Sequence, residues 1–293
     1  MIRRLAALLA ATAMAAAPTA GDAAERSVVW SVRGEHNTVY LFGSIHVLRP
    51  GDVGLPRAAA AAYEDAEQLV MEIDMDDPAI ADPLVMAGQM QRYAQLPAGQ
   101  SLQSVLGDDY STVVAYVREA GLDIAALDGF APWFVGMMVL QLEVAKRGFD
   151  PAHGIEQQVT DRAVADRKPI LGLETPADQF AVLASLSLPE QKRFLLMTLK
   201  ETDQADAKLD QLLNAWRTGD TATLAKVLSE EFEEFPELYR PLTEDRNRAW
   251  VEQLADLLDD RDDYLVVVGA LHLVGRNSVV DLLRQRGYRV TQD

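Results

Sequence analysis

The amino-acid sequence predicts an α/β fold: a central sheet, mixed or largely parallel, formed by the N- and C-terminal halves of the chain, with a long helical insertion between them. Two observations carry this prediction. Short apolar runs typical of strands lie near both ends of the chain and alternate there with helix-like segments. In the middle, apolar residues recur mostly at intervals of three and four, which is typical of amphipathic helices.

The N-terminal strands are expected at residues 28–32 and 39–45. They flank Gly34-Glu35-His36-Asn37, a segment rich in turn-forming residues, so the two strands are expected to form a hairpin. A helix over 57–65 then leads to a third strand at 68–73. The later strands are expected at 169–173, 264–271 and 288–291, and the helices at 108–120, 132–147, 155–166, 189–218, 221–228 and 236–258.

The first 23 residues have the features of a secretory signal peptide. Arg3 and Arg4 precede an apolar run over residues 5–17, and small residues surround Gly21-Asp22-Ala23. The apolar run of 13 residues is shorter than the roughly 20 that a membrane-spanning helix needs. We therefore expect the signal peptide to be cleaved near Ala23. The mature protein, residues 24–293, is expected to form a single domain in the periplasm or outside the cell and to lack an integral membrane segment.

Composition narrows the possible partners and chemistries. The chain has 27 Lys and Arg against 45 Asp and Glu, a net charge of −18, which would repel a phosphate backbone. Nucleic acid is therefore not an expected partner. The sequence contains no cysteine, which excludes disulfides, thiol nucleophiles and thiolate metal ligands. The oligomeric state is open.

The same short pattern ends two of the expected strands. Gly43-Ser44-Ile45-His46 follows the second strand, and Gly269-Ala270-Leu271-His272 follows the strand at 264–271, so two of only four histidines occupy equivalent positions. In open α/β sheets, ligands bind beyond the carboxyl ends of the strands. We therefore expect the two strands to be neighbours or nearly so, with both imidazoles facing one cleft.

Two glutamates occur in comparable places. Glu72 lies at the end of the third strand, and Glu174 follows the strand at 169–173. Such carboxylates are costly to bury unless they are paired or bind a metal, and two imidazoles with one or two carboxylates could form a catalytic metal site. The alternative is that each histidine makes a strand-end hydrogen bond and each glutamate pairs with an arginine.

Further motifs accompany the two Gly-x-x-His elements. They are Gly172-Leu173-Glu174 with Gln179, Gly154-Ile155-Glu156, Pro132-Trp133, Trp216-Arg217-Thr218-Gly219-Asp220 and Arg246-Asn247 before Trp250. Together these motifs resemble the TraB/GumN family, whose relatives include the Tiki peptidases and, more distantly, the erythromycin esterases and the haem-binding protein ChaN. The resemblance extends from about Val28 to Val290. It implies an α/β fold with an inserted helical region and, in the Tiki branch, metal-dependent peptidase activity. The site positions that it implies are His46, Glu72, Glu174, Arg246 and His272.

Three functional hypotheses follow from the residues and the resemblance. In the first, the protein is a metal-dependent hydrolase that acts on a peptide or small ester. His46, His272 and Glu174 bind a divalent transition metal (Mn, Co, Zn or Fe), and Glu72 or Glu174 is the general base. Arg246 stabilises the oxyanion or orients a glutamate. In the second, a metal-free esterase-like hydrolase uses His46 as its base. In the third, the protein binds haem, a peptide or a signalling partner without catalysis.

Overall fold

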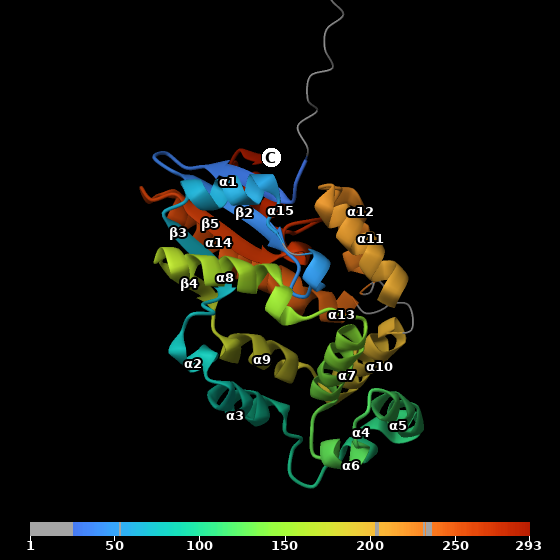
Figure 1. The fold of residues 1–293 in the computed structure, drawn as a ribbon. Helices are drawn as coiled ribbons and strands as arrows, with labels where there is room; N and C mark the ends of the chain where they lie inside the picture. The colour runs from blue at the N-terminus through green and yellow to red at the C-terminus, as the bar shows by residue number, and fades with distance from the viewer. Residues whose placement is uncertain (1–25, 53, 203–204, 231, 233–235) are drawn as a thin grey trace, which may run out of the picture.

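The computed structural model describes residues 26–52, 54–202, 205–230, 232 and 236–293 (Figure 1). The strands among these residues form a sheet with the order β4-β3-β5-β2-β1-β6. From β4 to β2 neighbouring strands are parallel, whereas β1 is antiparallel to both β2 and β6. The predicted α/β class is confirmed. The strands are β1 (Val29–Arg33), β2 (Thr38–Ser44), β3 (Gln68–Ile73), β4 (Ile170–Glu174), β5 (Tyr264–Gly269) and β6 (Val290–Gln292). The expected signal peptide, residues 1–23, lies outside the described residues.

Each expected strand is present, with boundaries that differ by at most two residues. The largest differences are at the C-terminal strands. β5 ends at Gly269 because Ala270–His272 form a 3₁₀ turn, η5, and β6 begins at Val290. The turn η5 changes the direction of the chain just before His272, so this histidine lies beyond the sheet rather than in it.

The pairing of β2 with β5 places the two Gly-x-x-His elements side by side. The strands are parallel, with Gly43 opposite Val268 and Ser44 opposite Gly269. All six residues of β5 are buried, as expected for a parallel strand that is covered on both faces. The prediction that the two strands are neighbours is confirmed, and their carboxyl ends lie at the same edge of the sheet.

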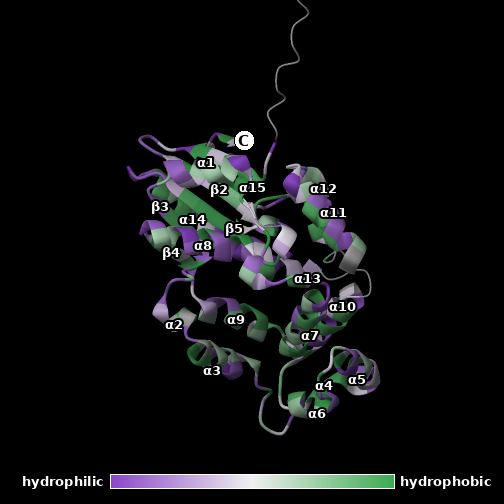
Figure 2. Ribbon diagram, viewed as in Figure 1, coloured by the Kyte–Doolittle hydropathy of each residue, from purple (hydrophilic) through white to green (hydrophobic). Residues whose placement is uncertain are grey.

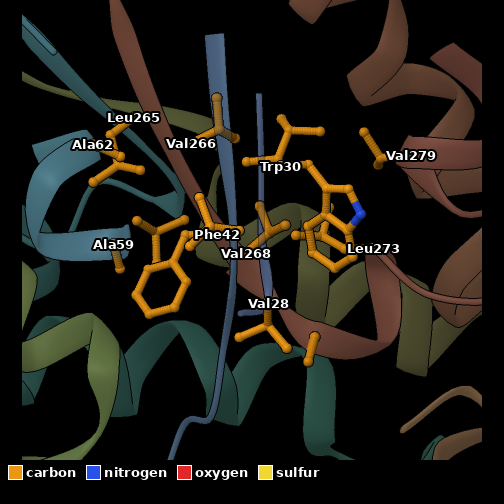
Figure 3. Packing of buried hydrophobic residues seen from close by; sticks show 14 of the residues in the cluster. Val28, Trp30, Phe42, Ala59, Ala62, Leu265, Val266, Val268, Leu273 and Val279 are labelled. Carbon is orange, nitrogen blue, oxygen red and sulfur yellow. The ribbon is translucent and has the colours of Figure 1, made fainter. Parts of the chain in front are cut away.

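Helices cover both faces of the sheet. Figure 3 shows Ala59 and Ala62 of helix α1 on one side of the strands, and Val279 of helix α15 with Leu273 on the other side. The α-helices are α1 (Arg57–Asp65), α2 (Pro78–Ala81), α3 (Pro83–Ala94), α4 (Leu102–Leu106), α5 (Tyr110–Glu119), α6 (Ile124–Leu127), α7 (Pro132–Lys146), α8 (Ile155–Asp166), α9 (Pro176–Ser185), α10 (Leu188–Thr202), α11 (Ala205–Arg217), α12 (Thr221–Glu230), α13 (Pro236–Tyr239), α14 (Asp245–Leu258) and α15 (Val279–Gln285).

The helical insertion lies below the sheet in Figure 1 and has hydrophobic clusters of its own. One cluster contains Val135 and Val139 of α7 with Leu195 and Leu199 of α10. Figure 2 shows hydrophobic residues along the central strands and along α7. Because β4 lies between α8 and α9 in the chain, the insertion is divided into two parts, and the middle of the sequence contributes one strand to the sheet.

Five short or polar-capped helices, α2, α3, α4, α6 and α9, were not expected from the sequence. α2 and α6 have four residues each and α4 has five, which is too short for a periodic apolar pattern. Side-chain caps mark the others: Asp82 accepts a hydrogen bond at the start of α3, and Thr175 and Asp178 form a capping box at the start of α9.

The expected helix over 236–258 contains a wide turn. α13 is followed by a π-helical segment, η4 (Arg240–Glu244), and then by α14. Pro241 has no backbone N–H and disturbs the regular hydrogen-bond ladder of a helix, which accounts for a π segment at this place. The wide turn directly precedes Arg246, so it contributes to the position of this side chain. The expected helix over 189–218 is represented by α10 and α11.

Candidate active site

His46 is held in place by the first turn of α8. The backbone N–H of Ile155 donates to the carbonyl of Ile45, and a Cβ at Gly154 would lie 2.2 Å from the carbonyl oxygen of His46. Only glycine permits this close approach of the two backbones. As a result, Glu156 on α8 reaches His46: Nδ1 of the imidazole lies 2.6 Å from Glu156 Oε1, which also accepts a hydrogen bond from the Ser44 hydroxyl.

The Glu156 carboxylate sets the charge and orientation of His46. Its negative charge is the main reason why the pKa of His46 is raised to about 9. Burial on its own would raise the pKa of Glu156, but the positive charge on His46 and the hydrogen bonds from His46 and Ser44 together outweigh this effect and lower it. With Nδ1 bound to the carboxylate, Nε2 is directed toward β5, where it lies 3.1 Å from the position that a Cβ of Gly269 would occupy.

Glu72 faces the same point from the neighbouring strand β3. Its Oε1 accepts a hydrogen bond from the Gly269 N–H at 2.7 Å and lies 3.2 Å from that same Cβ position. We call the space between His46 Nε2, Glu72 Oε1 and the Gly269 backbone the central gap. Any side chain at position 269 would fill the central gap, so glycine keeps it open.

A buried arginine joins the two predicted glutamates. Arg246 Nη2 donates to Glu72 Oε2 at 2.7 Å, and Arg246 Nε lies 3.0 Å from both oxygens of Glu174. The three side chains are only 12–15% exposed. Gln179 Nε2 and Trp250 Nε1 supply one further hydrogen bond each, to Glu72 and to Glu174. Burial raises the pKa of Glu72, but the neighbouring His272, His46 and Arg246, with the hydrogen bond from the Gly269 N–H, together lower it to about 2.

His272 lies behind this arginine and is neutral. Its Nδ1 is 2.7 Å from Asn247 Oδ1, and its Nε2 is 3.2 Å from Arg246 Nη1. Burial lowers the pKa of His272 to about 3, so the neutral ring donates from Nδ1 to Asn247 and accepts from Arg246 at Nε2. The indole of Trp250 packs against the imidazole, with ring centroids 4.5 Å apart.

The structure therefore brings all five predicted site residues to one edge of the sheet. Glu72, Glu174 and His272 contact Arg246 directly, and His46 meets Glu72 across the central gap. Sequence reasoning assigned no role to Glu156, the residue that orients His46, although Gly154-Ile155-Glu156 was among the motifs of the resemblance. Its position directly after Gly154, at the start of a helix, was the available signal.

The predicted metal ligands are not arranged around one shared position. Among the residues that the structure describes, no group of three or more His, Asp or Glu side chains is placed to hold a metal ion. The physical reason is the position of Arg246, whose guanidinium engages both oxygens of Glu174 and faces His272 Nε2. His46, His272 and Glu174 therefore do not fit a shared metal in this arrangement, and their role as ligands stays a prediction.

Comparison with known proteins identifies the family of the chain. Residues 28–292 match the TraB/PrgY/gumN family. The chain is 27% identical over 254 residues to the uncharacterized protein YbaP of Escherichia coli K12. This alignment covers 84% of this chain and 87% of YbaP. It is 26% identical over 322 residues to the metalloprotease TIKI2 of Xenopus tropicalis, covering 90% of this chain and 59% of TIKI2. It is 23% identical over 319 residues to the metalloprotease TIKI1 of Danio rerio, covering 90% of this chain and 62% of TIKI1. No solved structure matches. The chain belongs to the TraB/PrgY/gumN family.

Proposed function

We propose that this protein is a hydrolase that cleaves a peptide or small ester bond at the central gap, with His46 as the base that activates water. The observation that carries the proposal is the orientation of His46 by Glu156. A carboxylate bound to Nδ1 leaves Nε2 as the reacting nitrogen and stabilises the imidazolium that forms when Nε2 takes a proton.

In this reaction His46 Nε2 accepts a proton from water while the water oxygen attacks the carbonyl carbon. The tetrahedral intermediate then loses its amine or alcohol, which takes the proton from His46. Glu72, across the central gap, is the glutamate on the reacting side, and its negative charge also favours the imidazolium. Arg246 is engaged by Glu72, Glu174, Leu242 and His272, so we assign it the role of orienting the glutamates.

Metal-dependent hydrolysis at the same place is the second candidate. It is supported by the relatives from Xenopus tropicalis and Danio rerio, whose names describe metalloproteases. A bound divalent transition metal would supply Lewis acidity and a water of lowered pKa. Because Arg246 lies among the predicted ligands, we derive no step from a metal. Exhaustive chelation separates the candidates: the metal-dependent reaction stops and resumes when Mn, Co, Zn or Fe is restored, whereas the reaction of the first candidate continues.

We also propose that the protein acts in the periplasm or outside the cell, which is supported by the composition of residues 1–23. No helix among the described residues has the length and apolar character needed to cross a membrane.

The test measures hydrolysis of unstructured peptides and of nitrophenyl esters by three forms of the protein: wild type, His46→Ala and His153→Ala. His153 lies in η3 (Pro151–His153), close to α8 but outside the site, so its replacement is the matched control. We expect His153→Ala to retain activity and His46→Ala to lose at least about a hundredfold, the usual contribution of a general base. Equal activity in all three would overturn the proposal. A folded wild-type protein without activity on peptides or esters would also overturn it, in favour of the binding-protein hypothesis.

A further inference from the structure

β4 ends at the candidate active site and has an open edge. It is the terminal strand of the described sheet on that side, and Figure 1 shows it at the margin of the ribbon beside α2. Leu69 N–H donates to the Pro169 carbonyl, and in a parallel pair alternate residues face the same neighbour. Ile170 and Gly172 therefore direct their N–H and C=O groups away from β3. Leu171 and Gly172 are exposed, with 41% of Leu171 accessible.

A pocket of about 450 Å³ lies at the carboxyl end of this edge. Asp74 and Asp77 line it together with Glu174, whose charge is paired with Arg246, and none of the described lining residues is basic. Gln89 adds a further acceptor from α3, because its buried Oε1 has no hydrogen-bond partner among the described residues. A pocket that contains two aspartates and a buried amide oxygen, and no basic lining residue, is complementary to a cationic side chain.

These two features lead directly to the proposed site. Gly172 lies on the edge and on the pocket, and Glu174, two residues further along β4, contacts Arg246. Because a strand rises about 3.3 Å per residue, a chain that pairs with β4 needs only a few more residues to reach the central gap. Natural sheets often cover or charge such an edge, whereas here an uncharged leucine and a glycine are exposed.

We infer that β4 binds an extended peptide by strand addition and that the adjoining pocket takes a Lys or Arg side chain of that peptide. Backbone hydrogen bonds to Ile170 and Gly172 would supply affinity, and the acidic pocket would supply specificity. The inference rests on the proposed hydrolase function and narrows its substrate class to basic, unstructured peptides. The net charge of −18 agrees with a basic partner, since it would accelerate the encounter.

The experiment measures binding rather than turnover. Fluorescence anisotropy follows a labelled peptide of about 10 residues, alternating Lys and Thr, on wild-type protein and on His46→Ala. Two further peptides are compared with it: one with Glu in place of Lys, and one with N-methyl groups on alternate residues, which cannot donate to a strand edge. We expect both changes to weaken binding by about tenfold or more.

Protein variants locate the binding surface. Leu171→Lys places a positive charge on the edge, and Val164→Lys places the same charge on α8 at a residue that is 48% exposed. Asp74→Asn removes charge from the pocket, and Asp76→Asn removes it from a neighbouring exposed residue. We leave Gly172 unchanged because a Cβ there would lie 2.9 Å from the Asp74 nitrogen. Binding should weaken in Leu171→Lys and Asp74→Asn by about tenfold and stay within about twofold in their controls.

Three results would overturn the inference: equal binding of the N-methylated peptide, equal effects of the test and control variants, or no binding of the basic peptide. A dimer that dissociates in Leu171→Lys, without peptide binding, would assign the edge to a second copy of the chain. This inference and the proposed hydrolase function can be contradicted independently of each other. A protein that binds as expected but cleaves nothing contradicts only the hydrolase proposal, and one that cleaves peptides without using β4 contradicts only this inference.

Discussion

His46 and Glu156 form an ion pair, with 2.6 Å between Nδ1 and Oε1, that joins the end of β2 to the first turn of α8. The two residues are 110 positions apart in the chain and meet because Gly154 allows the start of α8 to lie against the backbone of His46. The pair determines which imidazole nitrogen faces the central gap and at which pH that nitrogen can accept a proton.

Replacing Glu156 by Gln should lower the pKa of His46 from about 9 toward its ordinary value of 6.5, because the carboxylate charge is the main cause of the shift. NMR titration of the imidazole measures this change directly. Glu64→Gln, which removes a carboxylate from the surface pair with Arg162, is the control and should leave the titration unchanged. A His46 pKa near 9 in Glu156→Gln would contradict the assignment.

The same pair gives a stability contribution with a defined pH dependence. The pKa of His46 is higher in the folded protein than in the unfolded chain, so the contribution is fully present below about pH 6.5 and is lost as the pH rises through about 9. Urea unfolding of wild type and Glu156→Gln at several pH values should show a difference in the free energy of unfolding that shrinks over this window. A difference that grows with pH would contradict the sign.

Glu72→Gln should destabilise the fold because it removes one of the two buried carboxylates that neutralise Arg246. Breaking a buried ion pair costs about 3–5 kcal/mol, and we expect about 2 kcal/mol here because Glu174 remains. The pKa of Glu72 is depressed to about 2, so this contribution is present above about pH 4.5 and is lost as the pH falls toward 2. Equal stability of both proteins in urea at neutral pH would contradict the buried pair.

Gly269→Ala should impair the reaction more than the fold. The added methyl group would lie 3.1 Å from His46 Nε2 and 3.2 Å from Glu72 Oε1, so it would fill the central gap where water and the substrate carbonyl must meet. We expect a loss of kcat of about a hundredfold or more. Gly129→Ala is the control, because a Cβ there has no neighbour within 4 Å. Full activity in Gly269→Ala would show that the reaction occurs elsewhere.

Export predicts a mature N-terminus near Ala24. Mass spectrometry of the protein recovered from its native compartment should find residues 1–23 removed. Recovery of the soluble protein from the cytoplasm with Met1 intact would contradict the expected localisation.

The sequence was sufficient to predict the sheet and to bring the strand-end residues His46, His272, Glu72 and Glu174 to one edge of it, because both depend on local patterns. β2 and β5 share a Gly-x-x-His ending, and parallel strands bring equivalent endings to one edge of the sheet. The partner of His46 could not be predicted from spacing, since Glu156 approaches through the packing of α8 against the end of β2. The central position of Arg246 is equally non-local, because the two glutamates that its guanidinium joins, Glu72 and Glu174, are 174 and 72 positions away in the chain.

The central claim is that hydrolysis requires His46 as the general base, in its deprotonated form. The pH dependence of kcat/KM in the presence of a chelator tests this claim most directly. For wild type, the rate should rise about tenfold per pH unit and level off near pH 9, where His46 loses its proton. The His46→Ala protein should be at least about a hundredfold slower and lack this limb. A wild-type rate that is flat between about pH 7 and pH 9, or the same limb in His46→Ala, would contradict the account.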